Sequence, residues 1–217
     1  MRNLRAWVLG VVIGGVLVAP PLHGQVEVSP RDGWQRVDAI VAALEVEAGD
    51  WIADIGAGSG FLSFRLSPIV GPAGRVVAVD VDRRAMRRLA ATAADEGFAN
   101  IDTVVSKADD PMLSPESVDG VVIVNAYHEM REYEAMLAGI RRALRPGGRL
   151  VIVDNPPSDS TDSRRAQTRS HDLAIDLVAQ DLETNGFRVI ARVPDFISGM
   201  AAGRRREQWL LVAVVAP

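Results

Sequence analysis

Seven short runs of mainly apolar residues recur along this chain, and stretches with helical spacing separate most of them. The runs cover residues 51–55, 76–79, a segment ending near 106, 121–124, 149–154, 187–193 and 208–215. Short apolar runs are typical of strands buried on both faces, and their alternation with helical stretches favours parallel pairing. The pattern therefore predicts an α/β domain built on a doubly wound sheet.

Local signals suggest where several helices and loops begin and end. Pro68 is expected to end or kink the helix that follows the first strand. Ser170 or Asp172 is expected to cap a later helix. Residues 204–206 should form a loop between two antiparallel strands, and residues 158–169 a polar loop near the active site that could serve as a mobile lid.

The turn after the first strand has an acidic residue followed by three glycines, in the spacing Asp54-x-Gly56-x-Gly58-x-Gly60. Glycine leaves room for a ligand to approach the backbone, and the N-terminus of the following helix attracts negative groups. The dinucleotide fingerprint requires its third glycine one residue later, at Phe61. Two interpretations stand at this point: a binding turn for another nucleoside ligand, or a plain strand–helix junction.

Acidic residues follow the second and third runs. Asp80 ends the second strand, at the edge of the sheet where α/β proteins bind ligands. A carboxylate can accept hydrogen bonds from both hydroxyls of a ribose, so we expect that role for Asp80 and a helix-capping role for Asp82. Asp109 and Asp110 follow the third run, in a loop whose acidic composition is also that of an ordinary turn.

The order of these features resembles the class I S-adenosylmethionine (SAM) dependent methyltransferases, in particular their small bacterial members. The resemblance covers residues 49–154 and includes the segments Asn125-Ala-Tyr-His-Glu129 and Leu144-Arg-Pro-Gly-Gly-Arg-Leu150. It implies a doubly wound, seven-stranded, mostly parallel sheet whose last strand inserts antiparallel between the fifth and the sixth. The Pro-Gly-Gly segment should end a helix, and the fifth strand should begin at Arg149.

The resemblance also implies SAM as the cofactor. Asp80 would bind the ribose, Val81 would lie against the adenine, and Asp109 would accept a hydrogen bond from the adenine amino group, with Asp110 as its competitor. The glycine turn would hold the methionine end, and Asp54 would support that turn or contact the methionine ammonium. The implied cofactor-binding residues are Asp54, Gly56, Ala57, Gly58, Gly60, Asp80, Val81, Ala108, Asp109 and Asn125.

The loop after the fourth strand carries the candidates for the chemistry. The implied reaction is an in-line displacement in which a small-molecule acceptor takes the methyl group, and alignment supplies much of the rate. Asn125 is expected to contact the methyl-donor region or the substrate, and His128 to act as the general base. The alternative for His128 is a histidine that only packs or forms hydrogen bonds near this loop. Tyr127 is expected to form a wall of the pocket, and Glu129 to pair with His128 or to face solvent.

A SAM-binding protein without turnover, in a sensory or structural role, is the alternative function, and only a product assay distinguishes it from the enzyme. A third reading is an enzyme of this fold that uses an aminopropyl donor or a nicotinamide dinucleotide. The glycine spacing disfavours the dinucleotide, and Asn125 and His128 disfavour the aminopropyl donor.

No metal is expected. Asp154-Asn155 resembles the pair that holds Mg²⁺ in catechol O-methyltransferase-like enzymes, but those enzymes also need an aspartate at the end of the fourth strand, where this chain has Asn125. The loss of one carboxylate weakens a site for a hard cation. His171 is interpreted as a loop residue.

Composition narrows the class of partner. The 217 residues, 48% of them hydrophobic, suffice for one α/β domain with a sizeable core. A formal net charge of −4 argues against nucleic acid, which normally requires a broad basic patch. The sequence contains no cysteine, which excludes disulfides and thiolate chemistry. The expected partner is a small-molecule substrate, and the oligomeric state stays open.

Residues 1–24 differ from the remainder, 25–217, which is the expected methyltransferase domain. Two arginines precede an apolar stretch at residues 6–19, which is short for a membrane span. This is typical of a signal peptide, with a membrane anchor as the alternative. The protein would be exported (periplasmic or secreted) if the leader is cleaved, membrane-tethered if it is not, and cytoplasmic if the start codon is misassigned. Export conflicts with the use of SAM, because SAM is made in the cytoplasm.

Overall fold

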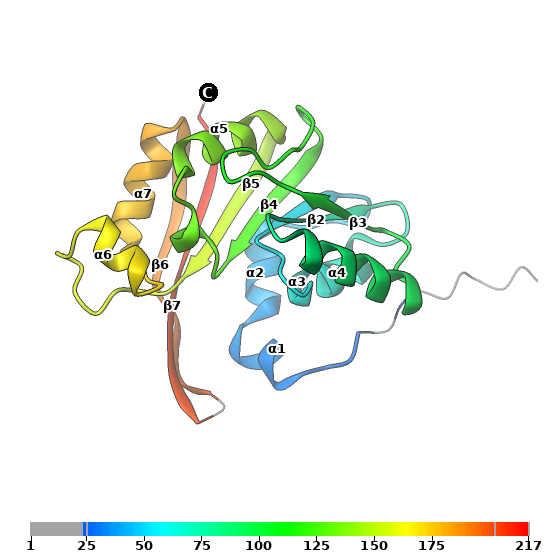
Figure 1. Cartoon of the computed structure of the whole chain (residues 1–217), viewed down its shortest axis with the longest axis horizontal. Coiled ribbons are helices and arrows are strands. Elements are labelled where there is room, and N and C mark those ends of the chain that lie inside the picture. The colour runs from blue at the N-terminus through cyan, green and yellow to red at the C-terminus, as the bar shows by residue number, and fades with distance from the viewer. Residues whose placement is uncertain (1–23, 25, 202, 217) are drawn as a thin grey trace, which may run out of the picture.

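The computed structural model describes residue 24 and residues 26–201 and 203–216. A seven-stranded sheet runs through the domain, and helices cover both of its faces (Figure 1). The strands are β1 (Trp51–Ile55), β2 (Arg75–Asp80), β3 (Ile101–Val105), β4 (Val118–Val124), β5 (Leu144–Asp154), β6 (Phe187–Ala201) and β7 (Arg204–Val215). Their order in the sheet is β3-β2-β1-β4-β5-β7-β6.

The pairing confirms the predicted topology. Neighbouring strands from β3 to β5 are parallel, whereas β7 is antiparallel to both β5 and β6 and lies between them. The chain runs outward from β1 to β2 and β3 on one side, and from β4 to β5 on the other. Such a reversal opens a crevice at the carboxyl ends of β1 and β4, where ligands bind in open α/β sheets.

The helices divide between the two faces. They are α1 (Pro30–Trp34), α2 (Val37–Leu44), α3 (Phe61–Val70), α4 (Arg83–Asp95), the 3-10 turn η1 (Tyr127–Glu129), α5 (Tyr133–Ala143), α6 (Arg164–Arg169) and α7 (Ile175–Thr184). Val121 and Ile123 of β4 pack in a core with α5 and α7, and Val122 between them packs in a second core with α2, α3 and α4. Because both faces of the sheet are buried, the central strands read as continuous apolar runs.

Two element boundaries differ from the prediction. α3 continues past Pro68 to Val70, because the proline lies in the last turn and removes only one hydrogen bond there, while Gly71 N–H still donates to Ser67 O (3.2 Å). β5 begins at Leu144 rather than Arg149, because Leu144 already pairs with Val118. A register shift then accommodates the Pro-Gly-Gly segment before the pairing resumes at Arg149. The strand therefore starts before the turn residues that were expected to precede it.

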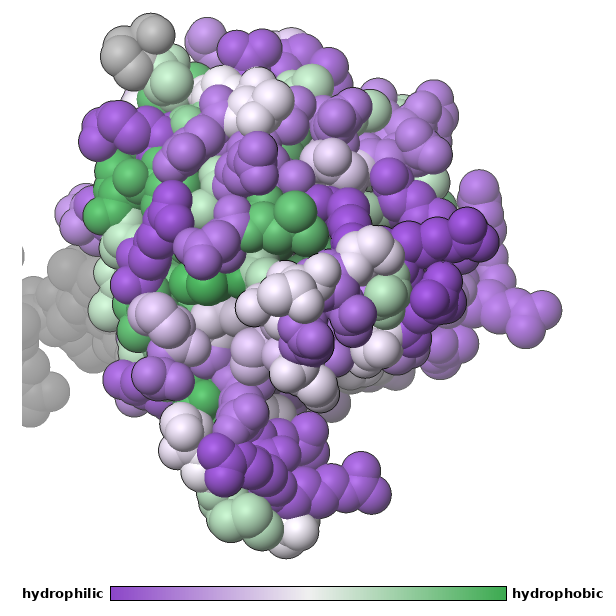
Figure 2. All heavy atoms as spheres, turned by 90° about the vertical axis from the view of Figure 1, so that its left-hand side faces the viewer, coloured by the Kyte–Doolittle hydropathy of each residue, from purple (hydrophilic) through white to green (hydrophobic). Residues whose placement is uncertain are grey.

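β6 and β7 form a long hairpin that projects beyond the sheet (Figure 1). Residues 204–206 belong to β7 and pair with β6, so the loop expected there is wrong. An exposed hairpin arm does not need apolar residues, and its sequence therefore resembles a polar loop. Hydrophilic side chains gather on this projection, which lies at the bottom of the view in Figure 2.

The region before α7 also differs in detail. Residues 158–169 include the helix α6, which Ser163 caps by accepting a hydrogen bond from Ala166 N–H. Ala174 occupies the N-cap of α7, so neither Ser170 nor Asp172 caps that helix. Within the part of the chain that the structure describes, no helix is long and apolar enough to cross a membrane. Apart from Gly24, the expected leader at residues 1–24 lies outside the described residues.

Candidate functional site

The glycine turn joins β1 to α3 and is held against β2. The N–H groups of Gly56 and Ala57 both donate to the carbonyl oxygen of Val79 (2.8 and 3.1 Å), and Gly60 N–H donates to Ala57 O (2.8 Å). α3 follows Gly60 without a side-chain cap. Since the first N–H groups of a helix have no partner within it, this N-terminus is the element of the turn that can attract an anion.

The three glycines are required for different reasons. A Cβ on Gly56 (φ +78°) would lie 2.3 Å from the Cβ of Ala126, and one on Gly60 (φ +84°) would lie 2.8 Å from Leu89. Gly58 also has a positive φ, +55°, but a Cβ there would meet no atom within 4 Å. Packing therefore explains Gly56 and Gly60, and only Gly58 leaves open space for a ligand.

We expect Gly58→Ala to weaken SAM binding at least tenfold, because the added methyl group would occupy this open space. The folded protein should lose only about 1–2 kcal/mol of stability, the usual cost of an L-residue in the left-handed region. Calorimetric titration with SAM and thermal unfolding measure the two effects. Gly49→Ala is the matched control, since Gly49 also has a positive φ and nothing within 4 Å of its Cβ position. Equal SAM affinity in the two variants would contradict a ligand beside Gly58.

Asp54 lies in β1 under the turn and is only 3% exposed. Its Oδ2 accepts a hydrogen bond from the Ser63 hydroxyl of α3 (2.6 Å). Burial raises the pKa of Asp54 to about 6, although the bond from Ser63 opposes the shift. Asp54 and Ala57 line a cavity of about 210 Å³, together with Arg31, Gln35, Ser59 and Phe61.

Arg31 brings a cation to this smaller cavity. Its guanidinium carbon stands 3.9 Å from the centre of the Phe61 ring. Burial and the neighbouring charge of Arg65 lower the pKa of Arg31. Among the described residues its Nε finds no hydrogen-bond partner. The cavity therefore contains a carboxyl group, a guanidinium and a helix N-terminus, which can bind a molecule that carries both charges.

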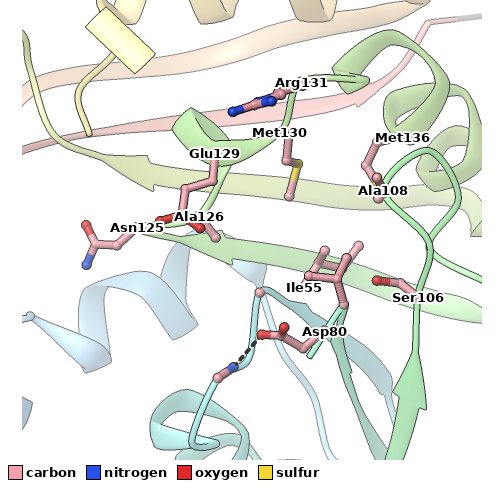
Figure 3. Close-up of a pocket in the computed structure, with 13 residues that line it drawn as sticks. Ile55, Asp80, Ser106, Ala108, Asn125, Ala126, Glu129, Met130, Arg131 and Met136 are labelled. Carbon is pink, nitrogen blue, oxygen red and sulfur yellow. Dashed lines mark hydrogen bonds between the residues drawn. The ribbon is translucent and has the colours of Figure 1, made fainter. Parts of the chain in front are cut away.

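Asp80 closes β2 and supports the turn. One carboxylate oxygen accepts a hydrogen bond from Gly58 N–H (2.9 Å), drawn in Figure 3, and the other accepts from Asp82 N–H (2.8 Å). Each oxygen has a second lone pair for a ligand. Asp82 accepts from Arg84 N–H (2.7 Å) and caps α4, as predicted.

A larger cavity of about 420 Å³ opens in front of Asp80 (Figure 3). Ile55, Ala126, Met130 and Met136 supply apolar walls. The predicted cofactor-binding residues that line it are Gly56, Gly58, Asp80, Val81, Ala108 and Asn125. Three of these, Gly56, Gly58 and Asn125, also line the smaller cavity, so the two adjoin. Apolar walls with few polar groups are typical of a small-molecule site.

The structure places the remaining predicted residues outside these walls. Gly60 lines neither cavity, and Asp109 is exposed beside Ala108 without lining either. Asp110 has a local role, because its Oδ1 accepts a hydrogen bond from Met112 N–H (2.8 Å).

Asn125 lies where the cavities meet. Its backbone is left-handed (φ +55°), and its N–H donates to Val153 O (2.8 Å). Its side-chain oxygen accepts a hydrogen bond from Gln208 of β7. It also lines a third cavity of about 330 Å³, whose other walls include Trp34, Asn155, Arg206 and Gln208.

His128 lies in η1 and is 4% exposed. Its Nδ1 is 2.7 Å from Asp154 Oδ1, and its backbone N–H donates to Asp154 Oδ2 (3.0 Å). Burial lowers the pKa of His128, but the hydrogen bond and charge of Asp154 outweigh it, so the net pKa is raised. His128 lines none of the three cavities, whereas its neighbour Glu129 lines the largest.

Tyr127 lies elsewhere than expected, whereas His171 lies in a loop as predicted. Tyr127 is fully buried in the core and donates a hydrogen bond to Asp181 (3.1 Å), so it is not a pocket wall. The turn of η1 directs its ring away from the crevice. His171 lies in the turn before α7, but its ring packs edge-on against His128, with ring centres 5.4 Å apart. The sequence did not indicate this contact, because η1 and that turn are far apart along the chain and meet only in the folded protein.

Sequence reasoning missed several lining residues. Arg31 and Gln35 precede the first strand, and Gln208 begins the last apolar run. A polar residue at the start of an apolar run is a signal in the sequence that could have identified Gln208. In the structure this side chain is buried, with 4% of its surface exposed. Arg31 and Gln35 carry no such signal, because their approach to the turn depends on how α1 folds back.

Known proteins resemble this chain in the same region. Residues 52–148 match a family described as "Methyltransferase domain". The ubiquinone/menaquinone biosynthesis C-methyltransferase UbiE of Hahella chejuensis is 31% identical over 144 residues, which are 64% of this chain and 58% of that protein. The chain therefore matches less than two thirds of that relative's length.

Solved structures agree on the fold. A SAM dependent methyltransferase from Aquifex aeolicus superposes with a TM-score of 0.72 at 20% identity, over 88% of this chain and 100% of that chain. Phosphoethanolamine N-methyltransferase 2 of Haemonchus contortus, solved in complex with SAM, gives a TM-score of 0.66 at 16% identity, over 85% of this chain and 53% of that one. The sequence match and the strand order agree. Over residues 52–148 the chain matches a methyltransferase domain, and its fold is that of the class I SAM-dependent methyltransferases.

Proposed function

We propose that this protein transfers the methyl group of SAM to a small-molecule acceptor. The observation that carries the proposal is the position of Asp80. Its carboxylate ends β2 at the wall of the 420 Å³ cavity, and that cavity adjoins the smaller one at Gly56, Gly58 and Asn125. A nucleoside with a charged amino-acid arm has this two-part shape.

The nucleoside fits the larger cavity. Asp80 would accept hydrogen bonds from the ribose hydroxyls with its remaining lone pairs. Val81, which is 61% exposed, and the apolar walls would cover the adenine. Asp109, next to the lining residue Ala108, is the proposed acceptor for the adenine amino group.

The amino-acid arm fits the smaller cavity. The N-terminus of α3 would attract the carboxylate, and Arg31 would bind the same group by a charge-assisted hydrogen bond. Asp54 would contact the ammonium in its ionised form. Arg31 adds to the groups that the sequence alone assigned to this arm.

SAM supplies an electrophilic methyl group whose leaving group is a neutral thioether, so no acid is needed on that side. The task of the chain is to align the acceptor with this methyl group. Asn125 lines all three cavities, and its amide would position donor and acceptor. The 330 Å³ cavity, with Trp34, Arg206 and three amide side chains, is the proposed acceptor site. The general-base role of His128 stays a prediction, and His128 lines none of the three cavities.

We expect Asp80→Ala to weaken SAM binding at least tenfold, by about 1.5–3 kcal/mol, through the loss of charge-assisted hydrogen bonds. Asp80→Asn is the matched control, because its amide oxygen can still accept the bond from Gly58 N–H and keep the turn in place. Calorimetry with SAM measures the affinity, and transfer of a labelled methyl group to candidate acceptors measures turnover. Unchanged affinity in Asp80→Ala would contradict the ribose assignment. Binding without a methylated product from any acceptor would instead favour a SAM-binding protein without turnover.

A further inference from the structure

Three side chains that can bind a metal meet beside the larger cavity. His128 and Glu129 belong to η1, and His171 belongs to the turn before α7. Glu129 Oε1 lies 3.7 Å from His128 Nε2 and 3.6 Å from His171 Nδ1. One ligand atom from each residue lies within 4.8 Å of the other two. These separations are too long for hydrogen bonds but near the edge of a tetrahedron around a metal, since bonds of about 2.1 Å place two ligand atoms about 3.4 Å apart.

Asp154 fixes the orientation of the His128 ring through its Nδ1 side. Its Nδ1 is 2.7 Å from the fully buried Asp154 carboxylate, which also accepts the His128 backbone N–H (3.0 Å). Hydrogen bonding at Nδ1 places the proton of the neutral ring there and leaves the lone pair on Nε2, facing Glu129 and His171. A carboxylate behind a histidine in this way is the usual outer partner of a metal-bound imidazole.

The segment with His171 is tied to the same strand end. Asn155, which follows β5, donates from its side chain to His171 O (3.2 Å), and its own carbonyl accepts from Leu173 N–H (2.9 Å). His171 has a left-handed backbone (φ +60°), an uncommon conformation for a residue other than glycine. These bonds hold the backbone of His171 at the end of β5, where its ring packs edge-on against that of His128.

We propose that His128, Glu129 and His171 form a binding site for a divalent transition-metal cation of the Zn²⁺ type. Two imidazoles and one carboxylate suit this class rather than Mg²⁺, and three protein ligands leave a fourth position open. Glu129 and His171 have exposed side chains, so an ion can reach the site. The site differs from the Asp154-Asn155 pair considered above, because Asp154 faces His128 and serves as its outer partner.

The site has a consequence for His128. A cation at Nε2 uses the lone pair that a general base would need, so the two roles exclude each other. Glu129 also lines the larger cavity, so the proposed metal site lies beside the proposed nucleoside site.

Zinc titration of the full-length chain, after treatment with a chelator, tests the proposal without SAM. We expect one equivalent of Zn²⁺ to bind in competition with a chromogenic chelator, and Mg²⁺ in excess not to displace it. His171→Ala and Glu129→Gln should each weaken Zn²⁺ binding at least about tenfold, no less than the loss of an outer-shell partner. Co²⁺ in place of Zn²⁺ should give the visible absorption of a tetrahedral site in the wild type and lose it in His171→Ala.

The chain offers a matched control in its third histidine, His23, which lies outside the described residues. His23→Ala should bind Zn²⁺ as the wild type does, and Glu96→Gln, an exposed acid in the distant α4 region, should do the same. Zinc affinity that survives His171→Ala, or that falls equally in His23→Ala, would overturn the assignment. SAM affinity should be unchanged in His171→Ala, so failure of the metal site and failure of the proposed function give different results.

Discussion

Replacing Asp154 with alanine is expected to lower the free energy of unfolding by about 3–5 kcal/mol, because several donors would lose their acceptor at a cost of about 1–3 kcal/mol each. Asp154 is fully buried at the end of β5. Its oxygens accept hydrogen bonds from His128 N–H (3.0 Å) and Asn155 N–H (2.9 Å), and its Oδ1 lies 2.7 Å from His128 Nδ1. Alanine would leave these three donors without an acceptor in the interior.

Asp154→Asn separates hydrogen bonding from charge and volume. Its amide oxygen can still accept one or two of the bonds, so we expect a smaller loss, about 1–3 kcal/mol. Urea denaturation of both variants at neutral pH measures the difference. A loss below about 1 kcal/mol in the alanine variant would mean that this carboxylate does not hold η1 to the end of β5.

The second large effect is a gain in stability. Asp54→Asn is expected to raise the free energy of unfolding by about 3 kcal/mol near neutral pH, because the folded protein holds an ionised carboxylate with a pKa raised from 3.8 to about 6. Asparagine has nearly the same volume, carries no charge, and its amide oxygen can still accept the bond from the Ser63 hydroxyl.

The gain should depend on pH in a defined direction. The folded-state pKa of Asp54 lies above its ordinary value, so the protonated group favours the fold fully below about pH 4, and this contribution is lost as the pH rises through about 6. The variant should therefore match the wild type near pH 4 and exceed it above about pH 7. Denaturation curves across this range measure the difference, with Asp109→Asn as an exposed control. A difference that does not change with pH would contradict titration of a buried Asp54.

The same substitution should harm the proposed function. If the ionised Asp54 contacts the methionine ammonium, SAM affinity in the wild type should rise with pH through about 6, since binding then favours the deprotonated group. Asp54→Asn should bind SAM weakly and without this pH dependence. Higher stability with weaker binding is the pattern expected where a strained group is kept for function.

The sheet could be predicted from the sequence because its strands are buried on both faces. β1, β2 and β4 are short, and each ends in the crevice, so apolar runs and the polar residues after them marked both the strands and the site. The position of Asp80 could be predicted from the sequence because Asp80 is the residue that ends β2. The order of the seven strands came from the family resemblance, since apolar periodicity carries no information on which strands are neighbours.

Other features depend on contacts between distant segments. Nothing near His171 in the sequence indicates that its ring meets that of His128, and the contact requires η1 and the turn before α7 to flank β5. The β6–β7 arm has polar residues, so its pairing leaves no apolar signal. Gly56 appeared to make room for a ligand, whereas its Cβ position is excluded by Ala126 of the fourth strand's loop.

Gln35, Gln208, Asn125 and Asn155 join in a continuous series of amide hydrogen bonds under the 330 Å³ cavity. Amide side chains neither gain nor lose protons in water at ordinary pH. Acidification that neutralises Asp54 therefore leaves this series unaltered. The two ends of the proposed reaction centre thus differ in one respect: Asp54 beside the methionine arm changes its charge with pH, whereas the four amides that join the other end do not.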